Sequence, residues 1–139
     1  MISLCIFAAT CLVEQEVRNS IKDPNLAPYL MAMAARESRF DARAVGQAGE
    51  LGIFQLKPST ALGLRCITHA KQLFDIRINT ICAEKYIVSL RSNEKDIYST
   101  LRAYNAGPNR KYGKRNAKKH AYVKMILKEV DRQKYMVKY

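Results

Sequence analysis

Glu37 is the residue of this sequence best placed to act as a general acid. It lies at the end of a predicted helix whose preceding turn carries Met33 and Ala34. A carboxyl group among apolar side chains keeps its proton near neutral pH, because desolvation raises its pKa, and glycoside cleavage needs such an acid. The alternative is an exposed glutamate paired with Arg36 or Arg39. The aromatic residues that could complete an apolar wall are Phe40, Phe54 and Tyr104.

Three short motifs follow one another in a specific order around this glutamate. R-E-S-R-F covers 36–40, G-E-L-G-I-F-Q-L-K-P covers 49–58, and A-Y-N-A-G-P covers 103–108. Together they resemble the catalytic domain of the soluble lytic transglycosylases, lysozyme-like enzymes that cut peptidoglycan. The resemblance extends from about Pro24 to Tyr122.

The resemblance implies cleavage of the β-1,4 bond between N-acetylmuramic acid and N-acetylglucosamine. Glu37 would be the only acid and base, whereas most glycosidases use two carboxylates. It would protonate the bridging oxygen, the substrate acetamido group would support the cation, and Glu37 would then take the C6 hydroxyl proton as a 1,6-anhydro ring closes. The resemblance implies no metal and no cofactor. The residues it implies in substrate binding are Ser38, Phe54, Gln55, Tyr104 and Asn105.

Two of these residues also have structural interpretations. Asn105, ahead of a Gly-Pro pair, could cap a turn. Tyr104 could be a core residue with a satisfied hydroxyl group. Gln55 has the weakest structural alternative, because a buried amide after Ile53 and Phe54 would need hydrogen-bond partners.

The sequence departs from the family pattern at four places. Gly46 stands where the family usually has Ser, Phe54 replaces a Met, and Lys118–Lys119 replace an acidic position. Glu50 occupies a position that is commonly small. As a second carboxylate it could favour true hydrolysis, as in a goose-type lysozyme; the alternative is a solvated loop charge. A catalytically inactive wall-binding or structural virion module is a further alternative.

The elements that must position these residues are predicted to be helices. Apolar residues at three-to-four spacing predict a first helix over 2–21, interpreted as a core helix because no Lys or Arg precedes its apolar stretch as in a signal peptide. Asp23-Pro24 predicts the start of a helix that ends near Glu37, and 41–52 predicts an irregular or extended loop. Further helices are predicted from Pro58 and over 76–90, 96–104 and 121–134.

These elements predict a mainly α, lysozyme-like single domain over 1–139, with a short irregular or extended segment after the catalytic helix. The apolar run over 2–13 is too short to span a bilayer. No transmembrane span is therefore expected.

The net charge of +12 is concentrated in the C-terminal segment 110–139, which lies within the predicted domain. Its basic residues are opposed only by Glu129 and Asp131. Such a segment favours an anionic partner, for which the envelope is our first interpretation, although a solvated helix face is the alternative. No nucleic-acid motif accompanies the charge, so nucleic acid is not the expected partner.

The cysteines leave two possibilities open. Cys66 and Cys82 could form a disulfide in an oxidising compartment, or remain two buried thiols. A zinc site formed by these two with His69 and His120 does not have the usual spacing.

The biological setting follows from the substrate. Peptidoglycan lies outside the inner membrane, and no convincing export signal is visible. This combination favours a phage virion enzyme, or one delivered to the host periplasm, and a bacterial periplasmic enzyme is the alternative. The expected partners are peptidoglycan glycan strands and, beyond them, other virion or envelope-machine proteins.

Overall fold

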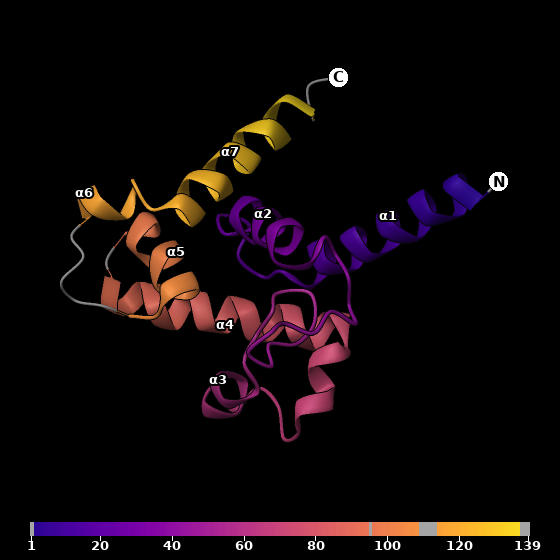
Figure 1. The fold of residues 1–139 in the computed structure, drawn as a ribbon, viewed down its shortest axis with the longest axis horizontal. Helices are drawn as coiled ribbons and strands as arrows, with labels where there is room; N and C mark the ends of the chain where they lie inside the picture. Colours follow the sequence, from indigo (N-terminus) through magenta and orange to yellow (C-terminus); the bar gives the residue numbers. More distant parts are fainter. Residues whose placement is uncertain (1, 95, 109–113, 137–139) are drawn as a thin grey trace. The chain divides into compact units, whose positions relative to one another are not determined.

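The computed structural model describes residues 2–94, 96–108 and 114–136. In these ranges it is helical with no strand, and isolated β-bridges join Val45 to Leu51 and Leu51 to Leu56 (Figure 1). The mainly α fold predicted from the sequence is confirmed. The elements are α1 (Ile2–Ser20), α2 (Ala27–Ser38), α3 (Pro58–Gly63), the 3₁₀-helix η1 (Ala70–Phe74), α4 (Ile76–Glu94), α5 (Ile97–Ala106), α6 (Lys114–Ala117) and α7 (Ala121–Met136).

The chain divides into two compact units, residues 1–84 and residues 85–139. Each unit is described by itself below, and a single domain over 1–139 stays a prediction. In the described ranges, no helix is both long enough and apolar enough to cross a membrane.

Helix α1 forms where the apolar spacing predicts it, but it is a core helix only near its end. Val17 is fully buried, whereas Leu12 is 72% exposed. Helix α1 contacts α2 within the first unit. The interpretation of 2–21 as a core helix is therefore correct for its last turns and wrong around Leu12.

Helix α2 begins three residues later than the Asp23-Pro24 pair predicts. Asp23 instead closes a turn, because its side chain accepts a hydrogen bond from Asn25 N at 2.9 Å and its carbonyl oxygen accepts one from Leu26 N at 3.0 Å. The proline in the first turn of α2 is Pro28, where the missing N–H costs nothing. The helix buries one continuous set of residues, Leu30, Met31, Ala32, Met33 and Ala34.

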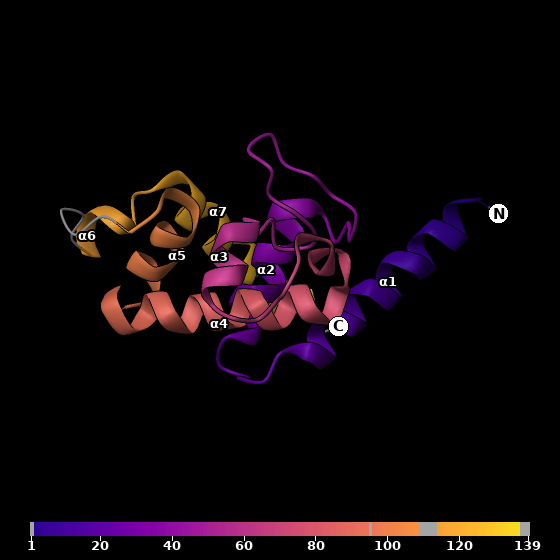
Figure 2. The same ribbon diagram turned by 90° about the horizontal axis from the view of Figure 1, so that it is seen from below.

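The segment between α2 and α3 is the irregular loop that the glycines predict, and Figure 2 shows it extending away from those helices. A hydrogen bond of 2.8 Å from Gly46 N to Glu50 O closes its tip, and one of 2.9 Å from Leu51 N to Leu56 O closes the next turn. Helix α3 then begins at Pro58, as predicted.

The second unit holds α5 against α6 and α7. Asp96 caps α5 by accepting hydrogen bonds from Ser99 N at 2.9 Å and from Ser99 Oγ at 2.8 Å. The helix ends before Gly107, whose φ of 82° favours glycine. These limits, and those of α4 and α7, agree with the predicted helices to within a few residues, whereas η1 and α6 were not predicted.

Candidate active site

Glu37 lies half-buried in the last turn of α2. Fully buried Met33 and Ala34 precede it by four and three residues, which is the spacing that brings side chains to one side of a helix. The chain leaves the helix through Arg39 and Phe40, which have left-handed φ values of 53° and 61°. These values are uncommon for residues other than glycine and turn the backbone sharply just after Glu37.

Ser38 connects this helix end to the following turn. Its Oγ donates a hydrogen bond of 2.7 Å to the carbonyl oxygen of Ile53 and accepts one of 3.2 Å from Asp41 N. The structure therefore brings the end of α2 that carries Glu37 to the turn that carries Gln55. Because the Ser38 hydroxyl proton is directed at the backbone, the observed function of this side chain is to position the turn, and substrate contact stays a prediction.

Gln55 also has an uncommon left-handed backbone, with φ of 50°. Its side chain Nε2 donates to Gly52 O at 2.9 Å and to Ala44 O at 3.2 Å, which uses both amide protons. The partners that a half-buried amide needs are therefore supplied by the loop backbone. The amide can still offer a ligand its oxygen, which can accept but not donate.

Phe54 is fully buried. Its ring therefore has no surface to offer a sugar in this conformation, which speaks against the predicted substrate contact. The position instead contributes to the core that supports the Gln55 turn.

Asn79 of α4 is a positioning residue that the sequence analysis missed. It is fully buried, its Oδ1 accepts a hydrogen bond of 3.1 Å from Phe54 N, and its Nδ2 donates to Leu51 O at 2.9 Å and Leu73 O at 2.8 Å. One side chain thus holds both sides of the turn that precedes Gln55. The available signal was a polar residue among the apolar residues of a predicted helix.

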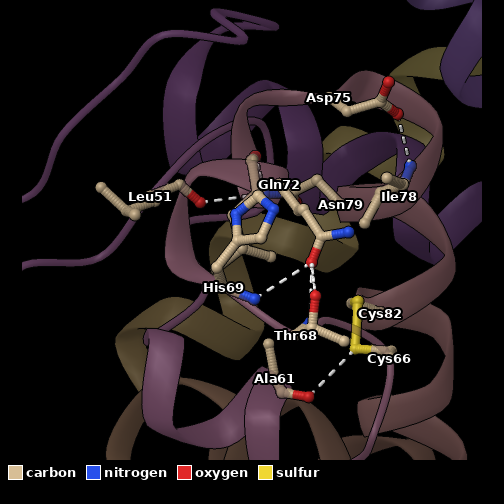
Figure 3. The surroundings of a disulfide bond; sticks show 11 residues. Leu51, Ala61, Cys66, Thr68, His69, Gln72, Asp75, Ile78, Asn79 and Cys82 are labelled. Atoms are coloured by element: carbon tan, nitrogen blue, oxygen red, sulfur yellow. Dashed lines mark hydrogen bonds between the residues drawn. A yellow bond between two sulfur atoms is a disulfide. The ribbon is translucent and has the colours of Figure 1, made fainter.

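Cys66 and Cys82 form a disulfide with a Cα–Cα distance of 5.7 Å (Figure 3). The bridge closes the segment that contains η1 and the start of α4. Within this segment, Gln72 Oε1 accepts hydrogen bonds from Thr68 N at 2.7 Å and His69 N at 3.1 Å. The disulfide interpretation is confirmed, and its two sulfur atoms are not available for the zinc site considered from the sequence.

Glu84 is a second residue whose function the sequence analysis missed. Its side chain is buried, and its carboxylate accepts hydrogen bonds from Lys22 N at 2.9 Å and Asp23 N at 2.7 Å. These bonds satisfy backbone groups in the connection from α1 to α2. Glu84 is therefore an anchor for that connection.

In the second unit, Tyr104 packs against Tyr86 of α4. The ring centroids are 5.3 Å apart and the planes are inclined by 47°, a common arrangement for aromatic pairs. Burial raises the pKa of the Tyr86 hydroxyl group above its ordinary value. Tyr104 itself is half-buried, so the predicted core interpretation applies only in part.

Asn105 follows at the end of α5 and is exposed. Over 2–94, 96–108 and 114–136, the structure gives its side chain no hydrogen bond, so the capping interpretation receives no support there. Its exposure is compatible with the predicted contact to a ligand.

The basic segment 110–139 lies partly outside the described residues. In α7, Arg132 makes two hydrogen bonds to Glu129, of 2.9 and 2.6 Å, and Lys134 lies 3.6 Å from Asp131. The hydrogen bond from Arg132 is the main reason that the pKa of Glu129 is lowered. Between 114 and 136, the lysines that are exposed and lie outside these pairs are Lys118, Lys119, Lys124 and Lys128.

A glutamate ends α2, and the turn that carries Gln55 is fastened to that end, which is the arrangement expected from the resemblance to the lysozyme-like enzymes. The sequence pattern of the Transglycosylase SLT domain matches residues 16–126. The chain belongs to the Transglycosylase SLT domain family, as its motifs predict.

Two solved structures show the same fold. The 70 kDa soluble lytic transglycosylase Slt70 from Escherichia coli matches with a TM-score of 0.68 and 21% identity, over 90% of this chain and 24% of that chain. An inactive mutant of lytic transglycosylase Slt from Pseudomonas aeruginosa matches with a TM-score of 0.64 and 19% identity, over 85% of this chain and 22% of that chain. The chain thus spans about a quarter of the length of either enzyme.

Proposed function

We propose that this protein is a peptidoglycan lytic transglycosylase in which Glu37 is the only general acid and base. The observation that carries the proposal is the hydrogen bond from Ser38 Oγ to Ile53 O, because it fastens the Glu37 end of α2 to the Gln55 turn. Membership of the Transglycosylase SLT domain family supports the reaction class.

The reaction begins with proton transfer from the Glu37 carboxyl group to the oxygen between N-acetylmuramic acid and N-acetylglucosamine. The bond from that oxygen to C1 of the muramic acid breaks, and the acetamido group of the same sugar supports the positive charge. The C6 hydroxyl then attacks C1, and the Glu37 carboxylate takes its proton. The products are a free N-acetylglucosamine end and a 1,6-anhydro end, and Glu37 is again protonated.

The remaining residues bind and orient the glycan in this proposal. Gln55 accepts a hydrogen bond from a sugar substituent through Oε1, the part of its amide that the loop leaves available. Tyr104 and Asn105 contact the glycan from α5, and Ser38 fixes the turn. Holding the C6 hydroxyl close to C1 gives it the advantage over water that ring closure requires.

We place the reaction in the periplasm. The Cys66–Cys82 bridge supports an oxidising compartment, and the substrate lies in the same compartment. Delivery by a phage virion and export by a bacterium both end there. The partners are glycan strands and the virion or envelope proteins that bring the enzyme to them.

Mass spectrometry of purified peptidoglycan after digestion tests the proposal. The wild type should release muropeptides one water lighter than reducing ones, and Glu37→Gln should release none. Glu16→Gln, an exposed glutamate of α1, is the matched control and should keep full activity. Reducing ends would instead indicate hydrolysis, and products from Glu37→Gln would exclude Glu37 as the acid.

A further inference from the structure

Helix α7 has two sides of different character. Its buried side consists of Tyr122, Val123, Ile126 and Val130. The exposed side chains opposite them, which we call the outer face of α7, are Lys124, Met125, Lys128, Arg132, Tyr135 and Met136. These positions recur every three or four residues and therefore form one stripe along the helix.

The positive charge of the outer face is not compensated within the helix where Lys124 and Lys128 lie. Toward the end of α7, ion pairs with carboxylates three positions earlier neutralise Arg132 and Lys134. In the part of the chain that the structure describes, neither Lys124 nor Lys128 forms an ion pair. Like charges four residues apart destabilise a helix, so an anionic partner that neutralises both lysines relieves a repulsion that α7 otherwise retains.

The outer face also carries apolar and aromatic side chains beside these charges. Met125 is 39% exposed, Tyr135 68% and Met136 70%. A soluble polyanion neutralises the lysines but gives the methionines no apolar surroundings. The surface of an anionic bilayer does both, because its phosphates attract lysine and its acyl boundary takes up apolar and aromatic side chains.

We propose that the outer face of α7 is a docking surface for an anionic phospholipid bilayer, on which the protein lies without crossing it. The lysine charges lie at the lipid phosphates, and the exposed methionines and Tyr135 enter the boundary below them. Because the buried side of α7 is opposite the outer face, docking requires no change in the core of the second unit. The inference goes beyond the proposed function and does not depend on it.

Sedimentation with lipid vesicles tests the proposal. The protein should bind vesicles made of equal parts of phosphatidylcholine and phosphatidylglycerol, bind vesicles of phosphatidylcholine alone much more weakly, and dissociate as the salt concentration rises. Lys124→Gln/Lys128→Gln should weaken binding to the anionic vesicles about thirtyfold, which corresponds to about 1 kcal/mol for each lysine near such a surface.

Lys22→Gln/Lys71→Gln is the matched control for the charges. It removes two exposed lysines of the first unit and lowers the net charge of the protein by the same amount. Because these lysines lie outside the outer face, binding to the anionic vesicles should stay within about threefold of the wild type.

Met136→Ser examines the apolar contribution. It should weaken binding to the anionic vesicles about fivefold, because the methionine then has no apolar surface to bury in the bilayer. Leu62→Ser changes a 45% exposed leucine of α3 and should leave binding unchanged. Equal effects of the two serine variants would contradict the insertion of the outer face into the lipid boundary.

The proposal fails if the two double lysine variants bind the anionic vesicles equally well, or if the wild type binds both kinds of vesicle equally. It also fails if the wild type binds no vesicle but binds a DNA oligonucleotide or purified peptidoglycan in a way that Lys124→Gln/Lys128→Gln weakens. That last result would assign the outer face to a soluble or wall polyanion instead of a bilayer.

Discussion

Gly52 and Gly107 have nearly the same positive φ, 75° and 82°, but entirely different surroundings. A Cβ at Gly52 would overlap Leu73 O and Asn79 Nδ2, whereas one at Gly107 would meet nothing within 4 Å. The turn before Gln55 is therefore fixed by tertiary contacts, and the end of α5 beside Asn105 by local backbone preference.

The largest effect should come from removing the buried amide that holds the Gln55 turn. Asn79→Leu removes the hydrogen bonds that the amide makes to Phe54 N, Leu51 O and Leu73 O, and Leu51 O keeps only the 3.2 Å bond from Leu56 N. It should lower the free energy of unfolding by about 4 kcal/mol. Urea denaturation measures this. A loss below about 1 kcal/mol would show that the turn does not depend on Asn79.

Gly52→Ala should be nearly as severe, by about 3 to 4 kcal/mol. Both the positive φ and the overlap with backbone and amide atoms oppose the new methyl group. The measurement is again urea denaturation, with Gly63→Ala as the control. Similar stabilities of the two variants would mean that the close approach at Gly52 is relaxed in solution.

Opening the Cys66–Cys82 bridge should cost about 3 kcal/mol, the chain-entropy value for a loop of this size. The double variant Cys66→Ser/Cys82→Ser should show this loss without reductant, and the wild type should show it only with reductant. Cys11→Ser, which changes a free cysteine that is exposed, is the control. A wild type that is insensitive to reductant while the double variant is destabilised would place the loss in packing and not in the bridge.

Gly107→Ala should cost about 2 kcal/mol, because its φ of 82° and ψ of 158° lie in a region that essentially only glycine adopts, and no neighbouring atom adds to that penalty. A cost equal to that of Gly52→Ala would remove the contrast between the two regions. Peptidoglycan cleavage by this variant also shows how strongly the predicted contribution of Asn105 to substrate binding depends on the conformation at the end of α5.

The smallest effect is a pH dependence of stability that comes from Tyr86, which packs against Tyr104 of α5. Burial raises the pKa of Tyr86, so the folded protein keeps a proton that the unfolded chain releases at lower pH. The stabilisation is complete below the ordinary tyrosine pKa of 10.0 and is lost as pH rises through the raised value. Melting temperatures from pH 8 to 11 should fall less for Tyr86→Phe than for the wild type; parallel curves would assign the fall to other groups.

The contrast between the Gln55 turn and the end of α5 also explains which parts of the structure the sequence could predict. Helix α5, with Asp96 at its start and Gly107 at its end, is determined by neighbouring residues, and its limits were predicted closely. The Gln55 turn depends on Asn79 and Ser38, which are distant along the chain, so their contacts with it could not be read from local pattern. The motif around Glu37 predicted the family, whereas the burial of Phe54 depends on packing that no motif encodes.

The Glu84 carboxylate has a kinetic consequence. It binds the N–H groups of Lys22 and Asp23, 62 and 61 positions away, and the chain between them carries Glu37 and Gln55. Closing so long a loop costs chain entropy before any contact compensates for it, which slows folding. We expect the Lys22 and Asp23 amides to become protected late in refolding, after the helices that lie between them and Glu84.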